Sequence, residues 1–115
     1  TTIPSTKKRI QKRGYNHTEL LASQLAKKLN LPYIKPLIKI KETKPLASLN
    51  PLERFLEING AFQIDEKTLN LDYKSILLID DILTTGTTAV EVARTLKETY
   101  PECKIYLLVL ATAKK

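Results

Sequence analysis

The spacing of hydrophobic and polar residues changes several times along the chain, and the first clear period is helical. In the segment HTELLASQLAKKLNLP, leucines recur every four positions and Pro32 follows the last of them. This pattern predicts a helix over about residues 18–29. Asn16 and Glu19 stand three positions apart at its start, as in a capping box.

Two later segments also carry helix-start signals. In NPLERFLEI, an asparagine cap, a first-turn proline and a reciprocal glutamate predict a short helix over residues 51–58. In TTAVEVARTLKETYP, Thr88 and Glu91 repeat the capping-box spacing. A further helix is therefore predicted from Thr88 until Pro101 ends it.

Strands are predicted between and after these helices. YIKPLIKIK alternates weakly, AFQI is a short apolar segment, and KIYLLVLAT is apolar along most of its length. Residues 76–79 form a continuous aliphatic run, the pattern of a strand buried on both faces of a parallel sheet. The alternation predicts one α/β domain over residues 1–115, with a mainly parallel central sheet flanked by helices.

Composition narrows the class of protein. The chain is 43% hydrophobic and 27% charged, which is typical of a soluble globular domain. The single cysteine, Cys103, excludes an intramolecular disulfide and a cysteine-cluster metal site, so a reducing cytoplasm fits. We expect Cys103 to be a small apolar residue beside a strand. No apolar run approaches the roughly 18 residues that span a bilayer, so no membrane insertion is expected.

The start of the chain combines an apolar pair with a basic cluster. Ile3-Pro4 resembles the second half of an opening strand, and the first residue is not methionine, so we expect a domain truncated at its N-terminal side. The net charge is +7, which suits anionic partners such as phosphates or nucleic acid. The basic cluster consists of Lys7, Lys8, Arg9, Lys12 and Arg13.

Candidate chemistry gathers after the aliphatic run. Asp80 and Asp81 follow it directly, and ligands of open α/β sheets bind beyond the carboxyl ends of the strands. Neighbouring strand side chains point opposite ways, so two ionised aspartates cannot both enter an apolar core without a large desolvation cost. The hydroxyls and backbone N–H groups that come next precede a helix start and favour an anion. They belong to Thr84, Thr85, Gly86, Thr87 and Thr88.

Carboxylates beside an anion site suit one ligand that has both hydroxyls and a phosphate, such as a sugar phosphate. Mg²⁺ fits the same place, because it binds through few carboxylates plus ligand oxygens. The alternative is an ordinary strand end followed by a polar helix cap. A nucleoside triphosphatase would need a Walker G-x-x-x-x-G-K-[ST] motif, which is absent, and a receiver domain would need a later aspartate, but none follows Asp81.

These residues carry a family resemblance. ILLIDDILTTGTTA resembles the 5-phosphoribosyl-1-pyrophosphate (PRPP) binding motif of type I phosphoribosyltransferases. KKRIQKRGYNHTELLASQLAKKL and ETKPLASLNPLERFLEINGAF resemble segments of the ComF/GntX-like competence proteins, so the resemblance spans nearly the whole chain. It implies the type I phosphoribosyltransferase fold.

The resemblance also implies roles for single residues. Asp80 and Asp81 would be the catalytic pair that holds the ribose 2′- and 3′-hydroxyls, with Mg²⁺ held close by, directly or through ligand and water. Arg13-Gly14-Tyr15 matches the turn that takes pyrophosphate, where Gly14 allows a close approach of backbone to an anion. The implied 5′-phosphate ligands are Thr84, Thr85, Gly86, Thr87 and Thr88.

Some positions depart from the family pattern or fit it loosely. Leu46 stands where these sequences often have glutamine, and Glu57 where they often have asparagine, both in a segment expected to close over the site. Arg54 matches an arginine of that segment only loosely, with a solvated helix charge as its alternative. The cysteine-rich zinc-binding region that commonly precedes the domain in ComF proteins is missing.

Two functions remain open from the residues and the resemblance. The first is an enzyme that transfers a phosphoribosyl group from PRPP to an unidentified acceptor and releases pyrophosphate. His17 is expected to be a surface residue rather than its general base. The second is a non-catalytic module that handles single-stranded DNA during transformation, together with the competence machinery. Lys7, Lys8, Arg9 and Lys12 would bind that DNA, with Tyr15 and Tyr33 as stacking residues, and a homodimer is a further alternative for the assembly.

Overall fold

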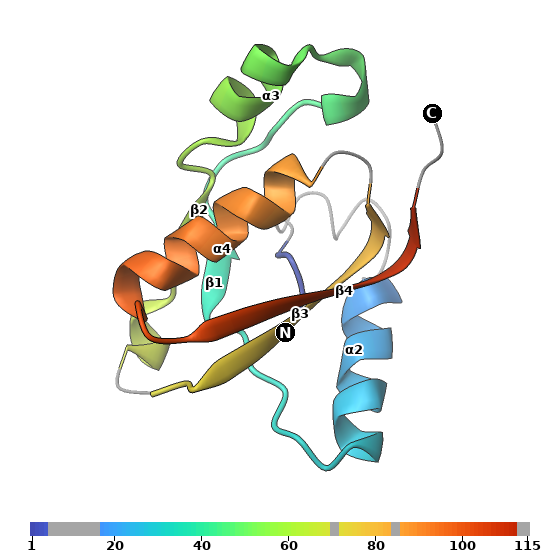
Figure 1. The fold of residues 1–115 in the computed structure, drawn as a ribbon, viewed down its shortest axis with the longest axis vertical. Coiled ribbons are helices and arrows are strands. Elements are labelled where there is room, and N and C mark those ends of the chain that lie inside the picture. Colours follow the sequence, from blue (N-terminus) through green and yellow to red (C-terminus); the bar gives the residue numbers. More distant parts are fainter. Residues whose placement is uncertain (5–16, 70–71, 84–85, 113–115) are drawn as a thin grey trace.

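The computed structural model describes residues 1–4, 17–69, 72–83 and 86–112 (Figure 1). Helices and strands alternate along the chain, much as the residue pattern predicts. In chain order the elements are α2 (His17–Lys28), β1 (Leu37–Lys39), η1 (Leu46–Ser48), α3 (Pro51–Ile58), β2 (Phe62–Ile64), η2 (Glu66–Thr68), β3 (Ser75–Leu83), α4 (Thr87–Thr99) and β4 (Lys104–Thr112). None of the helices in these described ranges is both long and apolar enough to cross a membrane.

Strands β3 and β4 form a parallel pair. Their register runs from Ser75 opposite Lys104 to Leu83 opposite Thr112. Parallel neighbours need a crossover connection, and α4 supplies it, running back alongside the pair in Figure 1. The chain therefore enters α4 after the carboxyl end of β3 and enters β4 at its amino end.

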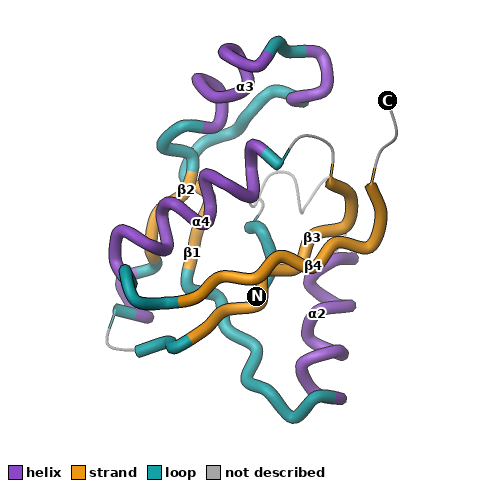
Figure 2. Tube along the Cα trace, viewed as in Figure 1, coloured by secondary structure: helices purple, strands orange, loops and turns teal. Residues whose placement is uncertain are grey.

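The expected central, mainly parallel sheet is not what the described residues form. Figure 2 shows two separate small sheets, of which β1 and β2 make an antiparallel one and β3 and β4 a parallel one. The Pro36 carbonyl accepts from the Asp65 N–H at 2.8 Å beside the β1–β2 ladder, but Pro36 has no N–H of its own to extend it. On the second edge of β3, the described chain adds a single parallel bridge between Thr2 and Ile79. The domain is thus mixed α/β with small sheets.

Helix α2 matches its predicted bounds to within one residue. Asn30 ends it with a positive φ of 56°, and the Leu31 N–H donates to the Ala26 carbonyl at 2.8 Å, as in a left-handed helix cap. Asn16 lies outside the described residues, and Glu19 forms an ion pair with Lys35.

The leucine stripe of α2 is not its most buried face. Ala22 is 3% exposed, whereas Leu21 is 40% and Leu29 is 53% exposed. Hydrophobic spacing alone locates a helix but not the depth at which it packs.

Helix α3 confirms the predicted capping box. The Glu53 N–H donates to Asn50 Oδ1 at 2.8 Å, and the Asn50 N–H donates to Glu53 Oε1 at 3.2 Å. Pro51 occupies the first helical position, where no N–H is needed. The helix ends before Gly60, whose φ of 72° lies in the left-handed region that glycine tolerates.

The predicted capping box of α4 is wrong. Gly86 is the N-cap residue, with a φ of 79° and no side-chain cap bond. Glu91 does not reach back to the helix start, because it lies on the buried face and is only 4% exposed. Its carboxylate accepts from the Gly60 N–H at 3.3 Å and from Arg94 Nε at 3.0 Å. Glu91 therefore ties α4 to the turn between α3 and β2.

The core fills the space between the two small sheets and α4. Cys103 is 1% exposed within it, and burial raises the pKa of its thiol, as expected for an inert small residue beside a strand. At its margin the Tyr100 hydroxyl donates to the Thr68 carbonyl at 2.9 Å. The buried cluster comprises Leu37, Ile58, Ala61, Phe62, Ile76, Leu78, Val92, Leu96, Tyr100 and Cys103.

Replacing Glu91 should destabilise the fold. Glu91→Ala removes the acceptor of the Gly60 N–H and the partner of Arg94, so the free energy of unfolding should fall by roughly 1–3 kcal/mol. The Arg94 guanidinium lowers the pKa of Glu91 below its ordinary 4.5. The ionised carboxylate therefore stabilises the fold above that pH, and this contribution is lost on acidification through the lowered pKa. Urea titrations at neutral and acidic pH would measure both effects.

Glu98 offers a matched control, since it also pairs with Arg94 but lies on the exposed side of α4. Glu98→Ala should change the free energy of unfolding by less than about 0.5 kcal/mol. Equal losses in the two variants would contradict a structural role for the Glu91 link.

Candidate functional site

Strand β3 carries both aspartates in its second half. The predicted strand, residues 76–79, continues in the structure through Asp80 and Asp81 to Leu83. The two carboxylates therefore lie within the strand, near its carboxyl end, rather than directly after it. This is the edge at which the connection to α4 begins.

Asp80 is partly buried in this strand. It lies opposite Val109 of β4, and its Oδ1 accepts from the Asp81 N–H at 2.9 Å. Burial raises the pKa of Asp80 to about 6, the neighbouring Asp81 carboxylate adds to the rise, and the bond from the Asp81 N–H opposes it. Asp80 is thus a carboxylate whose charge is only partly compensated by the protein.

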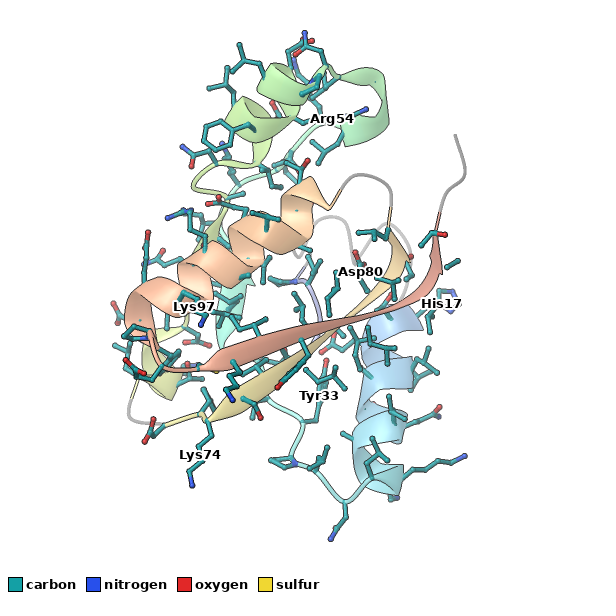
Figure 3. All side chains as sticks on the ribbon, viewed as in Figure 1. His17, Tyr33, Arg54, Lys74, Asp80 and Lys97 are labelled. Atoms are coloured by element: carbon teal, nitrogen blue, oxygen red, sulfur yellow. The ribbon has the colours of Figure 1, made fainter. Side chains whose placement is uncertain are left out.

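Asp81 is exposed and lines a cavity of about 320 Å³. The same cavity is lined by His17 and Thr18 from the first turn of α2 and by Leu110 of β4. Figure 3 shows His17 beside the end of β4 and Asp80 toward the end of β3. The fold therefore brings the start of α2 to the carboxyl end of β3, although the two are more than 60 residues apart in the sequence.

The start of α4 completes this edge. The Gly86 carbonyl accepts from the Val90 N–H at 2.9 Å, and glycine has no side chain with which to cap the first turn. Thr87 and Thr88 are half-buried in that turn. Backbone N–H groups and the helix dipole at such a terminus favour an anion.

Several predicted site residues lie outside the described part of the chain. Within the phosphate loop, Gly86, Thr87 and Thr88 are described, whereas Thr84 and Thr85 are not. The basic cluster and the predicted pyrophosphate turn also lie outside it, namely Lys7, Lys8, Arg9, Lys12, Arg13, Gly14 and Tyr15.

The segment expected to close over the site has local bonds of its own. Arg54 Nε donates to the Leu46 carbonyl at 2.9 Å, and Glu57 Oε1 accepts from the Lys44 N–H at 2.7 Å. Arg54 is therefore not simply a solvated helix charge. Leu46 and Glu57, the two departures from the family pattern, take part in holding this segment together.

Two features of this region are not marked by any local sequence pattern. His17 is exposed, as expected, and lines the same cavity as Asp81. Glu91, predicted to cap its own helix, instead bonds Gly60 and joins α4 to the α3 segment. Both features bring together segments that are distant in the sequence.

The carboxylates of Asp80 and Asp81 could bind a magnesium ion together with oxygens of a ligand. Among the described residues, no group of three or more histidine, cysteine, aspartate and glutamate side chains forms a metal cage. Asp80 and Asp81 supply two adjacent carboxylates, and Mg²⁺ commonly binds through one or two carboxylates plus ligand phosphate and water oxygens. The pair therefore fits a metal shared with a phosphorylated ligand.

Comparison with known proteins identifies the family. Residues 10–115 match the family described as Phosphoribosyl transferase domain. The chain belongs to this family. Its match covers the whole β3–α4–β4 unit, including both aspartates and Gly86.

The chain is also similar to two curated competence proteins. Competence protein F of Haemophilus influenzae is 30% identical over 97 residues, which are 84% of this chain and 42% of that protein. Competence protein ComFC of Bacillus subtilis is 35% identical over 96 residues, which are 84% of this chain and 37% of that protein. The chain thus spans about two fifths of the length of these relatives.

Asp80 should titrate well above an ordinary aspartate. Carbon-13 NMR of the side-chain carboxyls should show a pKa of about 6, against an ordinary value of 3.8. Asp81→Asn should lower this pKa but not restore the ordinary value, because burial is the larger cause. An Asp80 pKa near 4 in the unsubstituted protein would contradict the described burial.

The same raised pKa has a consequence for stability. Native Asp80 holds its proton to a higher pH than the unfolded chain, so its contribution to stability declines as pH rises from about 4 to about 6. Asp80→Asn should remove this decline, which urea titrations across that range would measure.

Proposed function

We propose that this phosphoribosyltransferase domain binds PRPP, or a similar ribose 5-phosphate ligand, with the help of Mg²⁺. The observation that carries the proposal is the convergence of two carboxylates, Asp80 and Asp81, with the glycine-capped start of α4 at one edge. A sugar phosphate has hydroxyls for the carboxylates and a phosphate for the helix terminus. The family match supports a ligand of this class.

Asp80 and Asp81 have different parts in this proposal. The exposed Asp81 would accept hydrogen bonds from the ribose 2′- and 3′-hydroxyls. Asp80, whose pKa is raised to about 6 by burial, is largely ionised at neutral pH but poorly compensated. A cation shared with the ligand would supply that compensation, and the bound metal would in turn neutralise charge on the pyrophosphate.

The phosphate groups would lie on either side of the ribose. The start of α4, with Thr84 and Thr85 before it, would take the 5′-phosphate through backbone N–H groups and hydroxyls. The pyrophosphate would lie toward the start of α2, because Arg13-Gly14-Tyr15 immediately precedes that helix and Asp81 lines a cavity with its first turn. Both ends of the ligand would then meet positive potential.

Transfer of the phosphoribosyl group to an acceptor is the enzymatic form of this proposal. The domain would fix the ribose and stabilise the departing pyrophosphate, so the rate enhancement would come from positioning and electrostatics. The charge of Arg13 and the metal would act on the leaving group. No described residue marks a pocket for a particular acceptor.

Calorimetry with PRPP tests the binding site. We expect Mg²⁺-dependent binding that Asp81→Asn weakens on the order of tenfold or more, since a hydrogen bond to a charged group contributes about 1.5–3 kcal/mol. Asp72→Asn is the matched control, because Asp72 is equally exposed but precedes the amino end of β3. Loss of affinity in both variants, or in neither, would refute the assignment of Asp81.

The same samples can report transfer. Pyrophosphate release from PRPP should require an acceptor, found by testing nucleobases and related compounds, and Asp81→Asn should reduce it. If PRPP binds but no compound of the panel causes pyrophosphate release, the domain is a binding module and not a transferase.

Handling of single-stranded DNA is the second candidate function. It is favoured by the names of the two relatives, both competence proteins, and by the net charge of +7. The basic residues before α2 would contact the DNA backbone, while the PRPP pocket would serve a separate or regulatory purpose. In this form the domain would work in DNA uptake with other competence proteins.

Charge reversal separates this role from a general surface effect. Lys8→Glu with Arg9→Glu should weaken binding to an oligothymidylate and reduce its salt dependence, because fewer counterions are released. Lys27→Glu with Lys28→Glu, at the exposed end of α2, changes the net charge equally and should have a smaller effect. If the two pairs of substitutions weaken DNA binding equally, the basic residues before α2 have no specific role in DNA binding.

A further inference from the structure

Strand β4 has an unprotected edge. It pairs with β3 on one side, and no other strand in the described ranges pairs with its second side. Edge strands are usually guarded by charged residues, proline or a bulge, yet residues 105–112 contain neither a charged residue nor proline. Its large side chains remain accessible, with Tyr106 57%, Leu107 42% and Leu110 56% exposed.

A cavity of about 700 Å³ runs beside this edge between β4 and α4. On the helix, Val90, Ala93 and Lys97 are spaced along one face, and Val90 is 69% exposed. We call this cavity the β4 groove. Its lining includes Val90, Ala93, Lys97, Lys104, Ile105 and Leu107, and it extends to Leu83 and Gly86 at the start of α4. Its walls are apolar except at the end that carries the two lysines.

Lys97 and Lys104 give the groove a polar end. Both side chains are exposed, and no hydrogen bond or ion pair of either ammonium is found in the described part of the chain. Glu98, next to Lys97 in the sequence, pairs with Arg94 instead. Figure 3 shows Lys97 on α4 above the first residues of β4. This end lies at the amino end of the strands, away from Asp80 and Asp81.

The charges of Lys97 and Lys104 favour one class of binding partner for the groove over others. A second copy of the chain carries a net charge of +7, so self-association would bring like charges together. Nucleic acid would suit the two lysines but not the apolar walls between Val90 and Leu107. A protein segment with both apolar side chains and carboxylates is complementary to both parts of the groove.

We propose that the free edge of β4 and the β4 groove bind an extended, acidic segment of another protein. The segment adds as a strand along β4, its alternate apolar side chains enter the groove, and its carboxylates meet Lys97 and Lys104. Main-chain hydrogen bonds along β4 supply affinity, whereas the groove and the lysines select the sequence. The lysine end of the groove lies away from Asp80 and Asp81, whereas its other end reaches Gly86 of the proposed PRPP site.

Synthetic peptides of the same length as β4 test this proposal. One carries valine at alternate positions, threonine between them and aspartates at both ends. A second replaces the aspartates with lysines. A third is the acidic peptide N-methylated on the backbone nitrogens that would face and donate to β4. Fluorescence anisotropy should show binding of the first, with at least tenfold weaker binding of the other two. The third peptide keeps the charge and the side chains, so it isolates strand addition from attraction to a basic protein.

Protein variants complete the test. Lys97→Glu with Lys104→Glu should weaken binding of the acidic peptide on the order of fivefold or more, because each reversal replaces an attraction to the aspartates with a repulsion. Lys27→Glu with Lys28→Glu is the matched control, at the last turn of α2, and should weaken it much less. Circular dichroism and thermal unfolding of each variant should match the unsubstituted protein.

Three results would overturn the proposal. The first is equal binding of the acidic peptide and its N-methylated form, which would leave only charge attraction. The second is equal weakening by the two variant pairs. The third is loss of oligothymidylate binding, but not of peptide binding, in Lys97→Glu with Lys104→Glu, which would assign these lysines to nucleic acid.

Discussion

The parallel pairing of β3 with β4 is the constraint on which the rest of the structure depends. Two parallel neighbours cannot be joined by a hairpin, so α4 must cross the sheet and return the chain to its amino end. The start of α4 thereby follows the carboxyl end of β3, which carries Asp80 and Asp81. A helix start, which attracts anions, and a pair of carboxylates, which attract hydroxyls and cations, become neighbours as a result of topology.

Two carboxylates, the buried Glu91 and the partly buried Asp80, differ in how the protein compensates their charge. Glu91 accepts bonds from Gly60 and Arg94, which lower its pKa and make it part of the fold. Asp80 has one backbone donor and an acidic neighbour, so burial raises its pKa to about 6. Only Asp80 therefore has negative charge that a ligand or metal could compensate. Carboxylates that take part in function usually differ in this way from those that stabilise a fold.

The carboxyl end of the β3–β4 pair and the edge of β4 also differ in which side chains they leave exposed. The carboxyl end has polar groups from three elements, α2, β3 and α4, as a ligand site requires. The edge of β4 has apolar side chains and two lysines, which suits a protein segment rather than a small molecule. A domain that matches about two fifths of its relatives' length can thus carry both a pocket and a second contact surface, which adjoin at Gly86.

The sequence by itself determined the local structure. Helices at residues 17–28 and 51–58, the Asn50 capping box and the β4 strand follow from short-range patterns, because caps and hydrophobic periods act within a few residues. The order of aspartates, threonines and glycine likewise indicated a sugar-phosphate site. Tertiary structure alone decided the division into two small sheets, the partners of Glu91 and the meeting of Asp81 with His17. Each of these depends on contacts between distant segments, whose geometry no local pattern contains.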